Sequence, residues 1–104
     1  MSFRSEKKTY AVEWRPLARE DLRGIIQYIG KDSKGRASVF GKTLQDRVAQ
    51  LAQFPRLGRE GRISGTRELV VHPNYIVFYR VLEDARRVQI LRVKHAAQYW
   101  PATP

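Results

Sequence analysis

Three runs of strand-forming residues, close together in the last third of the chain, limit most strongly the folds that it can adopt. The runs cover residues 67–71, 75–82 and 87–93 and are rich in Val, Ile, Tyr and Phe, whereas Pro, Asn and Asp stand in the two breaks between them. This partition is typical of a β-meander, because branched and aromatic residues favour strands and the others favour turns. We expect the rest of the chain to cover this sheet.

The first half of the chain predicts one strand and two helices. Residues 9–14 alternate between apolar and polar side chains, as a strand does. Pro16 then fits the first turn of a helix, since it lacks only an N–H that would be unpaired there. Apolar residues recur at helical spacing in the two segments that follow, so each predicts an amphipathic helix. The two stripes are Ala18, Leu22, Ile25, Ile26, Ile29 and Ala37, Phe40, Leu44, Val48, Leu51.

The ends of these helices are predicted from capping residues. Glu20 and Asp21 lie near the N-terminus of the first helix, where the helix dipole favours acidic residues, and Gly30 is the expected C-cap. Asp32 or Ser33 is expected to cap the second helix, which should stop at Phe54-Pro55. Two helices joined by so few residues fold back as an antiparallel hairpin.

The predicted order is therefore β-α-α-β-β-β, in one α+β domain that spans residues 1–104. The helical hairpin should pack on one face of a mainly antiparallel, twisted sheet, because both apolar stripes need a surface to cover. Residues 1–8 are expected to fray, residues 55–66 form a Gly- and Arg-rich connector, and residues 95–104 form a C-terminal tail. The position of the first strand in the sheet is left open.

The composition narrows the classes of partner and chemistry. Twenty Lys and Arg against ten Asp and Glu give a net charge of +10. Such a charge attracts nucleic acid, an anionic membrane surface or an acidic protein, although it can also serve solubility alone. The absence of Cys excludes disulfides, thiolate metal sites and a Cys nucleophile. No apolar run approaches the roughly 18 residues of a membrane span, and the N-terminus lacks the apolar part of a secretory signal. We therefore expect a cytoplasmic protein.

Several motifs in sequence order resemble a known family. WRPLAREDLRGIIQYI opens the first helix, and LAQFPRLGREGRISGTRELVV contains a helix ending at Phe-Pro, a Gly-Arg turn and a G-x-R-E-L strand. YIVFYRV and VQILRVKHAAQYWP follow as the last two strands and the tail. Together these segments, over about residues 9–101, resemble the RelE/ParE superfamily of toxins from bacterial type II toxin–antitoxin modules.

The resemblance implies a toxin that a cognate acidic antitoxin neutralises in a hetero-oligomer. In this family the C-terminal segment of the antitoxin wraps the toxin, usually as a helix along the two-helix hairpin and an extended piece near the sheet. The basic charge of the chain agrees with such a partner, because electrostatic steering speeds the capture of an acidic, disordered segment. The predicted antitoxin-binding residues are Leu22, Ile26, Phe40, Leu44 and Arg47.

The resemblance leaves two kinds of target open. RelE-like members cut mRNA in the ribosomal A site, and ParE-like members poison DNA gyrase. A metal-free ribonuclease needs a base, an acid and cations that stabilise the phosphorane. The candidates for these roles are His95, Tyr99, Arg62 and Arg80. Each also has a structural interpretation, such as a solvated strand arginine, a structural histidine or a tail aromatic that packs over the sheet. Neither branch calls for a metal or another cofactor.

Two observations favour the ParE-like branch, whose members are inhibitors rather than enzymes. Lys42 and Arg47 are five residues apart on the second helix, so they do not form the basic patch of RelE-like enzymes. The R-V-x-H pattern at residues 92–95 also resembles the ParE-like strand end, whereas the HAAQYWP tail fits either branch. The predicted target-binding residues are Arg59, Arg62, Arg67, Arg92, Lys94 and Trp100.

A third hypothesis is a small, non-toxic module that binds nucleic acid. Tyr75, Phe78 and Tyr79 could in principle stack on bases. Phe78 and Tyr79 are neighbours on a strand, however, and so face opposite sides of the sheet. The sequence therefore favours a gyrase inhibitor first, a ribosome-dependent mRNA endoribonuclease second, and the nucleic-acid-binding module last.

Overall fold

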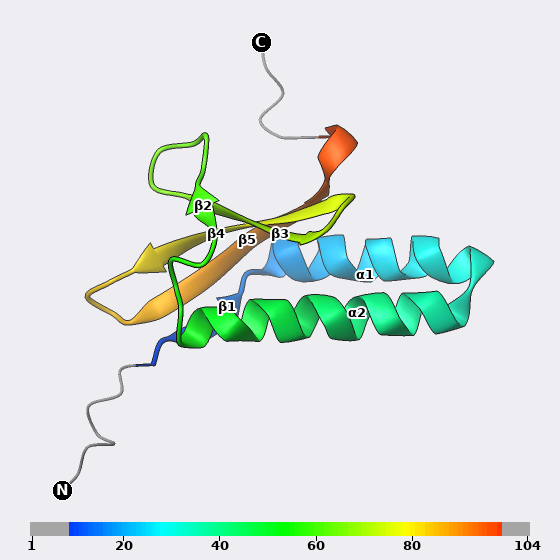
Figure 1. The fold of residues 1–104 in the computed structure, drawn as a ribbon, viewed down its shortest axis with the longest axis horizontal. Coiled ribbons are helices and arrows are strands. Elements are labelled where there is room, and N and C mark those ends of the chain that lie inside the picture. Colours follow the sequence, from blue (N-terminus) through cyan, green and yellow to red (C-terminus); the bar gives the residue numbers. More distant parts are fainter. Residues whose placement is uncertain (1–8, 99–104) are drawn as a thin grey trace, which may run out of the picture.

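The computed structural model of the chain describes residues 9–98, so the predictions for residues 1–8, Tyr99 and Trp100 lie outside the described residues. The predicted order of elements is confirmed, with one further short strand in the connector (Figure 1). The elements are β1 (Ala11–Trp14), α1 (Pro16–Asp32), α2 (Lys34–Ala49), the 3-10 turn η2 (Gln50–Ala52), β2 (Arg59–Glu60), β3 (Arg67–His72), β4 (Tyr75–Leu82), β5 (Arg87–His95) and the 3-10 turn η3 (Ala96–Gln98).

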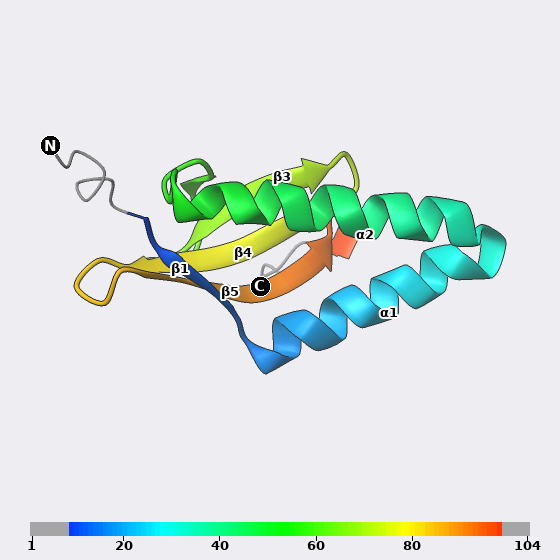
Figure 2. The same ribbon diagram turned by 90° about the horizontal axis from the view of Figure 1, so that it is seen from below.

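The five strands form one sheet in the order β1-β5-β4-β3-β2, and the two helices lie side by side on one of its faces (Figure 2). Strand β1 pairs with β5 in parallel, and all other pairs are antiparallel. Helix α1 packs along β5, and α2 packs along β3. The α+β fold class and the helical hairpin on a mainly antiparallel sheet are thus confirmed, and the open position of the first strand is now assigned.

The core lies between the helical hairpin and the sheet. Strand β4 runs through its centre, and Tyr75, Val77 and Tyr79 point from this strand toward the helices. The predicted helical stripes supply the other side of the core, because their spacing of three and four residues places them on one helix face. The buried helical members are Ala18, Leu22, Phe40, Leu44, Val48 and Leu51, with Ile25, Ile26 and Ile29 partly buried against them.

Two predicted helix ends are wrong, and one is confirmed. Helix α1 continues past Gly30 to Asp32, and Gly30 instead lies close to Ala37 of α2, with 3.7 Å between the ideal Cβ position and that methyl group. Ser33 caps α2, because its hydroxyl accepts a hydrogen bond from the Arg36 N–H at 3.1 Å. Helix α2 ends at Ala49 and tightens into η2 before Phe54-Pro55 is reached.

The connector contains strand β2, which the sequence analysis missed. Arg59 pairs with Glu68 and Glu60 with Arg67. A strand of two residues carries no readable alternation of side chains, so its pattern could not predict it. Its pairing makes the segment before β3 part of the sheet rather than a free loop.

Candidate target and partner surfaces

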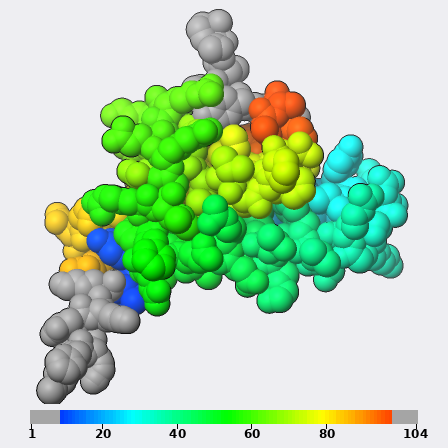
Figure 3. Space-filling view, viewed as in Figure 1, coloured from blue at the N-terminus to red at the C-terminus, as the bar shows by residue number. Residues whose placement is uncertain are grey.

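Side chains from the sheet fix the connector of residues 55–66, which stands above α2 on the face seen in Figure 3. The Tyr79 hydroxyl is buried; it donates to the Pro55 carbonyl at 2.7 Å and accepts from the Gly58 N–H at 2.9 Å. The Arg67 guanidinium donates to the Gly58 carbonyl at 2.7 and 3.0 Å. Because both bonding groups are held in the sheet, the first half of the connector has a defined conformation.

Glu68 fixes the second half of the connector from beneath. Its side chain is 2% exposed. One carboxylate oxygen accepts two hydrogen bonds from the Arg59 guanidinium, at 3.0 and 3.2 Å, and the other accepts the Arg62 N–H at 3.2 Å. A buried carboxylate is stable only with such partners. We refer to Tyr79, Arg67 and Glu68 together as the connector clasp.

The clasp changes the interpretation of the basic connector. Arg59 and Arg67, both predicted to bind the target, already bond within the protein, and Arg56 pairs with Glu83. Four arginines in this region, at positions 56, 59, 62 and 67, stand against three glutamates, at 60, 68 and 83, so the local net charge is +1. The connector, taken together with Arg67, Glu68 and Glu83, therefore contributes little to the overall positive charge.

Arg80, a predicted catalytic residue, belongs to a polar row on the face of the sheet that the helices leave uncovered. Its Nε donates to Gln89 Oε1 at 2.9 Å, and Gln89 Nε2 donates to Glu13 Oε1 at 3.2 Å. Arg15 donates to the second Glu13 oxygen at 3.0 Å. The hydrogen bonds from Gln89 and then Arg15 lower the pKa of Glu13. This row ties β4, β5 and β1 together.

Arg92, a predicted target-binding residue, instead bonds to α1. Its Nε and a terminal nitrogen donate to the two Asp21 oxygens at 2.8 and 2.9 Å, and these bonds raise the pKa of Arg92. The same carboxylate accepts the Val93 N–H at 2.9 Å. Pairing with β1 ends at Ile90, so Asp21 takes an amide on the edge of β5 that no strand covers. Asp21 thus joins α1 to β5 rather than stabilising the first turn of α1.

His95 lies at the end of β5, beside a cleft of about 630 Å³ between this strand and α1. Its ring meets the Tyr75 ring edge-on, with 5.0 Å between centroids, and its Nδ1 accepts the Ala97 N–H at 2.9 Å. Burial raises the pKa of Tyr75. Lys94, predicted to bind the target, lines the same cleft.

Two of the catalytic candidates, His95 and Arg80, do not converge. His95 pairs with Tyr75 on β4, and Arg80 lies five residues further along that strand, which at about 3.3 Å per residue separates them by about 17 Å. Arg62 lies in the connector, where its N–H donates to Glu68. Tyr99 is outside the described residues. Proton transfer needs groups within hydrogen-bond reach of the same substrate. His95 and Arg80 therefore lie too far apart to act on one phosphate.

A second groove, of about 370 Å³, lies on the outer side of the helical hairpin. Trp14, Leu22 and Ile26 contribute apolar surface, and Arg19 and Arg23 stand beside them. Two of the predicted antitoxin-binding residues, Leu22 and Ile26, therefore line a surface groove.

The other three predicted antitoxin-binding residues have different surroundings. Phe40 and Leu44 are buried in the core, and Leu44 is only 1% exposed. The reason is that the apolar stripe of α2 faces the sheet. Arg47 is half-buried and donates to Gln50 and to the Val70 carbonyl, at 3.0 and 3.4 Å.

The structure can also be compared with three other possibilities: base stacking, a metal site and a membrane span. Tyr75, Phe78 and Tyr79 are all buried, so none offers an open ring face on which a base could stack. Within residues 9–98, no three His, Asp or Glu side chains are grouped as a metal site. None of the helices in that range is long and apolar enough to cross a membrane.

A family model and a related protein each match most of this chain. A family model described as "ParE toxin of type II toxin-antitoxin system, parDE" matches residues 12–100. "Putative toxin Y4kP" from Sinorhizobium fredii is 41% identical over 91 residues, which cover 86% of this chain and 92% of that protein.

Solved structures with the same fold come from toxin–antitoxin systems. A chain of the chromosomal ParDE system from P. aeruginosa superposes with a TM-score of 0.74 at 23% identity, over 85% of this chain and 97% of that one. A chain of the RelBE2 toxin–antitoxin complex from Mycobacterium tuberculosis gives 0.56 at 27% identity, over 84% and 98%.

Proposed function

This chain belongs to the ParE toxin family of type II toxin–antitoxin systems, and from that premise we propose that it stops growth by poisoning DNA gyrase. On this proposal the protein acts in the cytoplasm as an inhibitor, not as an enzyme, and needs no cofactor. A cognate acidic antitoxin binds and neutralises it. The observation that carries the choice of target is the separation of two ribonuclease candidates, His95 and Arg80, along the sheet.

The bonds of those candidates support the same choice. Arg80 is engaged with Gln89 in the polar row. His95 uses Nδ1 to accept the Ala97 N–H, so only Nε2 is left to move a proton. A metal-free ribonuclease would need these cations and this imidazole around one phosphate. A binder needs no such convergence.

The groove on the helical hairpin supports the proposed antitoxin contact. Arg19 and Arg23 are four residues apart and so lie on one side of α1. Arg19 and Arg23 border the apolar surface of Leu22 and Ile26. An amphipathic, acidic helix would place its apolar face on that surface and its carboxylates against the arginines. The charge of +10 would speed its capture.

The target is tested with two assays on the purified protein. We expect added protein to inhibit gyrase supercoiling and to accumulate cleaved DNA complexes, while mRNA on translating ribosomes stays intact. His95→Ala should retain the effect on gyrase. Codon-phased cuts in ribosome-bound mRNA that disappear in His95→Ala would instead establish the RelE-like alternative. Normal growth at high expression of the soluble protein would contradict toxicity itself.

A further inference from the structure

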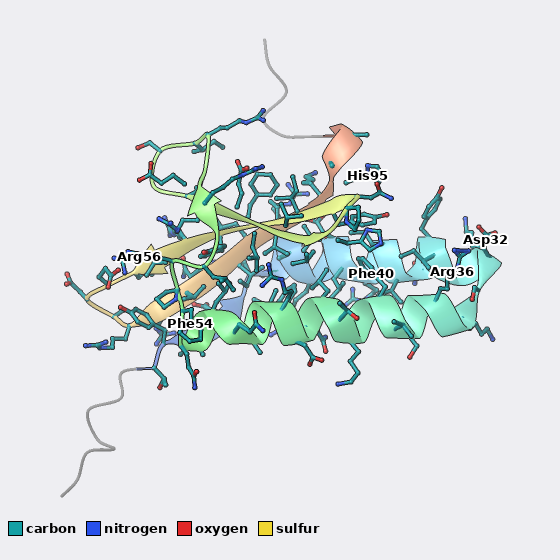
Figure 4. All side chains as sticks on the ribbon, viewed as in Figure 1. Asp32, Arg36, Phe40, Phe54, Arg56 and His95 are labelled. Atoms are coloured by element: carbon teal, nitrogen blue, oxygen red, sulfur yellow. The ribbon has the colours of Figure 1, made fainter. Side chains whose placement is uncertain are left out.

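Three aromatic rings stand in one row across the sheet, at the end where β5 passes into η3. His72 of β3 and His95 of β5 are both register partners of Tyr75 on β4. The ring centroids of His72 and Tyr75 lie 5.8 Å apart, and those of Tyr75 and His95 lie 5.0 Å apart. The Phe40 ring of α2 lies 5.1 Å from that of Tyr75, and Figure 4 shows Phe40 and His95 at this end of the sheet. The chain has two histidines, and both belong to this row.

Each histidine also closes the turn that follows it. His72 Nδ1 accepts the Asn74 N–H at 3.0 Å, in the turn between β3 and β4. His95 Nδ1 accepts the Ala97 N–H at 2.9 Å, at the start of η3. The two turns are bonded to each other, because the Asn74 carbonyl accepts the Ala96 N–H at 2.7 Å. We refer to these three hydrogen bonds as the histidine network.

The histidine network requires both imidazoles to be neutral. A ring nitrogen accepts a hydrogen bond only while it carries no proton, so each ring must hold its hydrogen on Nε2. In the charged ring both nitrogens are donors, and Nδ1–H would then point at a backbone N–H. Histidine is the side chain that ordinarily changes charge between about pH 5 and about pH 8. Protonation in this range therefore removes the two acceptors on which the network depends.

The titratable and charged residues that share a cleft with His95 come from α1, β4 and β5. They are Glu20, Asp21, Tyr28, Tyr75 and Lys94. Asp21 is engaged with Arg92, and tyrosine is neutral at these pH values. Glu20 and Lys94 carry opposite charges, so their effects on a charged His95 ring oppose each other. The Ala97 N–H is thus the contact that distinguishes the neutral ring from the charged one.

His72 is exposed and lies under α2 rather than beside the cleft. The residue of α2 that meets its ring is Phe40, with 5.7 Å between the centroids. Two charged residues share that side of the helix, Arg36 four positions before Phe40 and Arg47 seven positions after it. Arg47 donates to the Val70 carbonyl at 3.4 Å. Neither cation would stabilise a protonated His72 ring.

We infer that the two histidines form a pH-sensitive device, which holds the β3–β4 turn and the start of η3 together while both rings are neutral and releases them when the rings are protonated. The inference goes beyond the proposed target and does not depend on it. The two turns are coupled, because the N–H and the carbonyl of Asn74 belong to different bonds of the same network. Loss of the bond at one histidine should therefore loosen the turn at the other.

Amide exchange measured by NMR tests the device. Protection factors, which correct exchange rates for the intrinsic effect of pH, are compared at about pH 8 and about pH 5. In the wild type we expect protection of Asn74 and Ala97 to fall by about fivefold or more, as the loss of one hydrogen bond implies. Protection of Val77, in the middle of β4, should change by less than about twofold. The ring nitrogen shifts at the higher pH should show the hydrogen on Nε2 of both histidines.

Matched variants separate the acceptor from the ring. Asparagine does not titrate, and its side-chain oxygen can accept the N–H two residues further on. In His72→Asn/His95→Asn, protection of Asn74 and Ala97 should therefore differ by less than about twofold between the two pH values. His95→Phe keeps a ring beside Tyr75 but has no acceptor. Ala97 should then be poorly protected at both pH values, and protection of Asn74 should fall by about twofold or more through the shared network.

The outcomes that would overturn the inference are distinct. Constant protection of Asn74 and Ala97 in the wild type would show that the turns do not respond to histidine charge. An equal fall in the double asparagine variant would show that another group responds to pH. Unchanged protection of Asn74 in His95→Phe would mean that the two turns are independent. If the double variant does not fold, His72→Asn and His95→Asn decide singly, each at the amide that its own side chain binds. None of these results bears on growth inhibition, so the proposed function stands or fails separately.

Discussion

The helix–sheet core and the connector are held in place by different forces. In the core, side chains such as Leu44, Val77 and Ile90 are buried by apolar contacts that depend on volume and area. In the connector, Tyr79, Arg67 and Glu68 hold backbone groups through directional hydrogen bonds. One sheet therefore supports a tightly packed apolar layer on the side of the helices and a connector with a hydrogen-bonded, defined conformation at its edge. Each region should therefore respond to a different kind of substitution.

Leu44→Ala should have the largest effect, because it leaves a cavity under the helical hairpin. Leu44 is buried against the sheet, and deletions of this kind cost about 2–5 kcal/mol. We expect the free energy of unfolding in urea to fall by about 3 kcal/mol. Thr43→Ala, at an exposed position next to it, is the matched control and should change this value by less than about 0.5 kcal/mol. Equal effects of the two variants would contradict the assigned faces of α2.

Tyr79→Phe should loosen the connector without emptying the core. The ring remains, but the Pro55 carbonyl and the Gly58 N–H lose the hydroxyl that pairs them. Unsatisfied buried groups cost about 1–3 kcal/mol, so we expect a loss of about 2 kcal/mol. Amide exchange should accelerate at Gly58 more than in α2. Tyr28→Phe is the control, since that ring is largely exposed. If amide exchange accelerated equally in the connector and in α2, the connector would not open independently of the core.

The same contrast explains what the sequence could predict. Apolar residues at spacings of three and four predicted the core stripes of both helices, and strand composition predicted β3, β4 and β5, with β4 correct to the residue. Hydrogen bonds between residues distant in sequence leave no period. The Tyr79 hydroxyl bond to Pro55 and the Asp21 bond to Arg92 join residues 24 and 71 positions apart, and neither could be predicted.

The candidate site was predictable only in its residue types. The sequence analysis proposed target binding for Arg59, Arg67 and Arg92 and catalysis for Arg80, and each of these residues has a bonding partner within the described chain. The motif G-x-R-E-L, which contains two members of the clasp, Arg67 and Glu68, was the one available hint.

Asp21→Asn tests a polar contact that joins helix α1 to the sheet, and it should lower stability less than Tyr79→Phe does. The amide keeps an oxygen for the Val93 N–H but loses the charge that holds Arg92 in a two-point bond. Both side chains are partly buried, so we expect the free energy of unfolding to fall by about 1 kcal/mol. Exposed pairs contribute about 0–1 kcal/mol, and the loss should exceed this range only if Arg92 is left unpaired. The control is Asp46→Asn in the exposed pair with Lys42, which should change stability by less than about 0.5 kcal/mol. Equal losses would show that burial adds nothing to the Asp21 pair.

Acid should produce the smallest effect, through two exposed glutamates at the edges of the sheet. Hydrogen bonds from Gln89 and Arg15 lower the pKa of Glu13, and the Tyr10 hydroxyl and the Arg56 guanidinium lower that of Glu83. The unfolded chain then binds more protons than the folded one just below the usual value of 4.5, so stability rises with pH in this window and is lost as pH falls through the folded-state pKa.

The double variant Glu13→Gln/Glu83→Gln isolates this contribution. We expect the urea midpoint of the wild type to fall more steeply from about pH 5 to about pH 3 than that of the variant, because only the wild type loses these two charges. Both carboxylates are accessible to solvent, so high salt should reduce the difference between the two proteins by screening. Parallel pH profiles of the two proteins at low salt would show that the charges of Glu13 and Glu83 do not contribute to stability. The polar contribution to stability would then come from the buried groups of the clasp and from the Asp21–Arg92 pair.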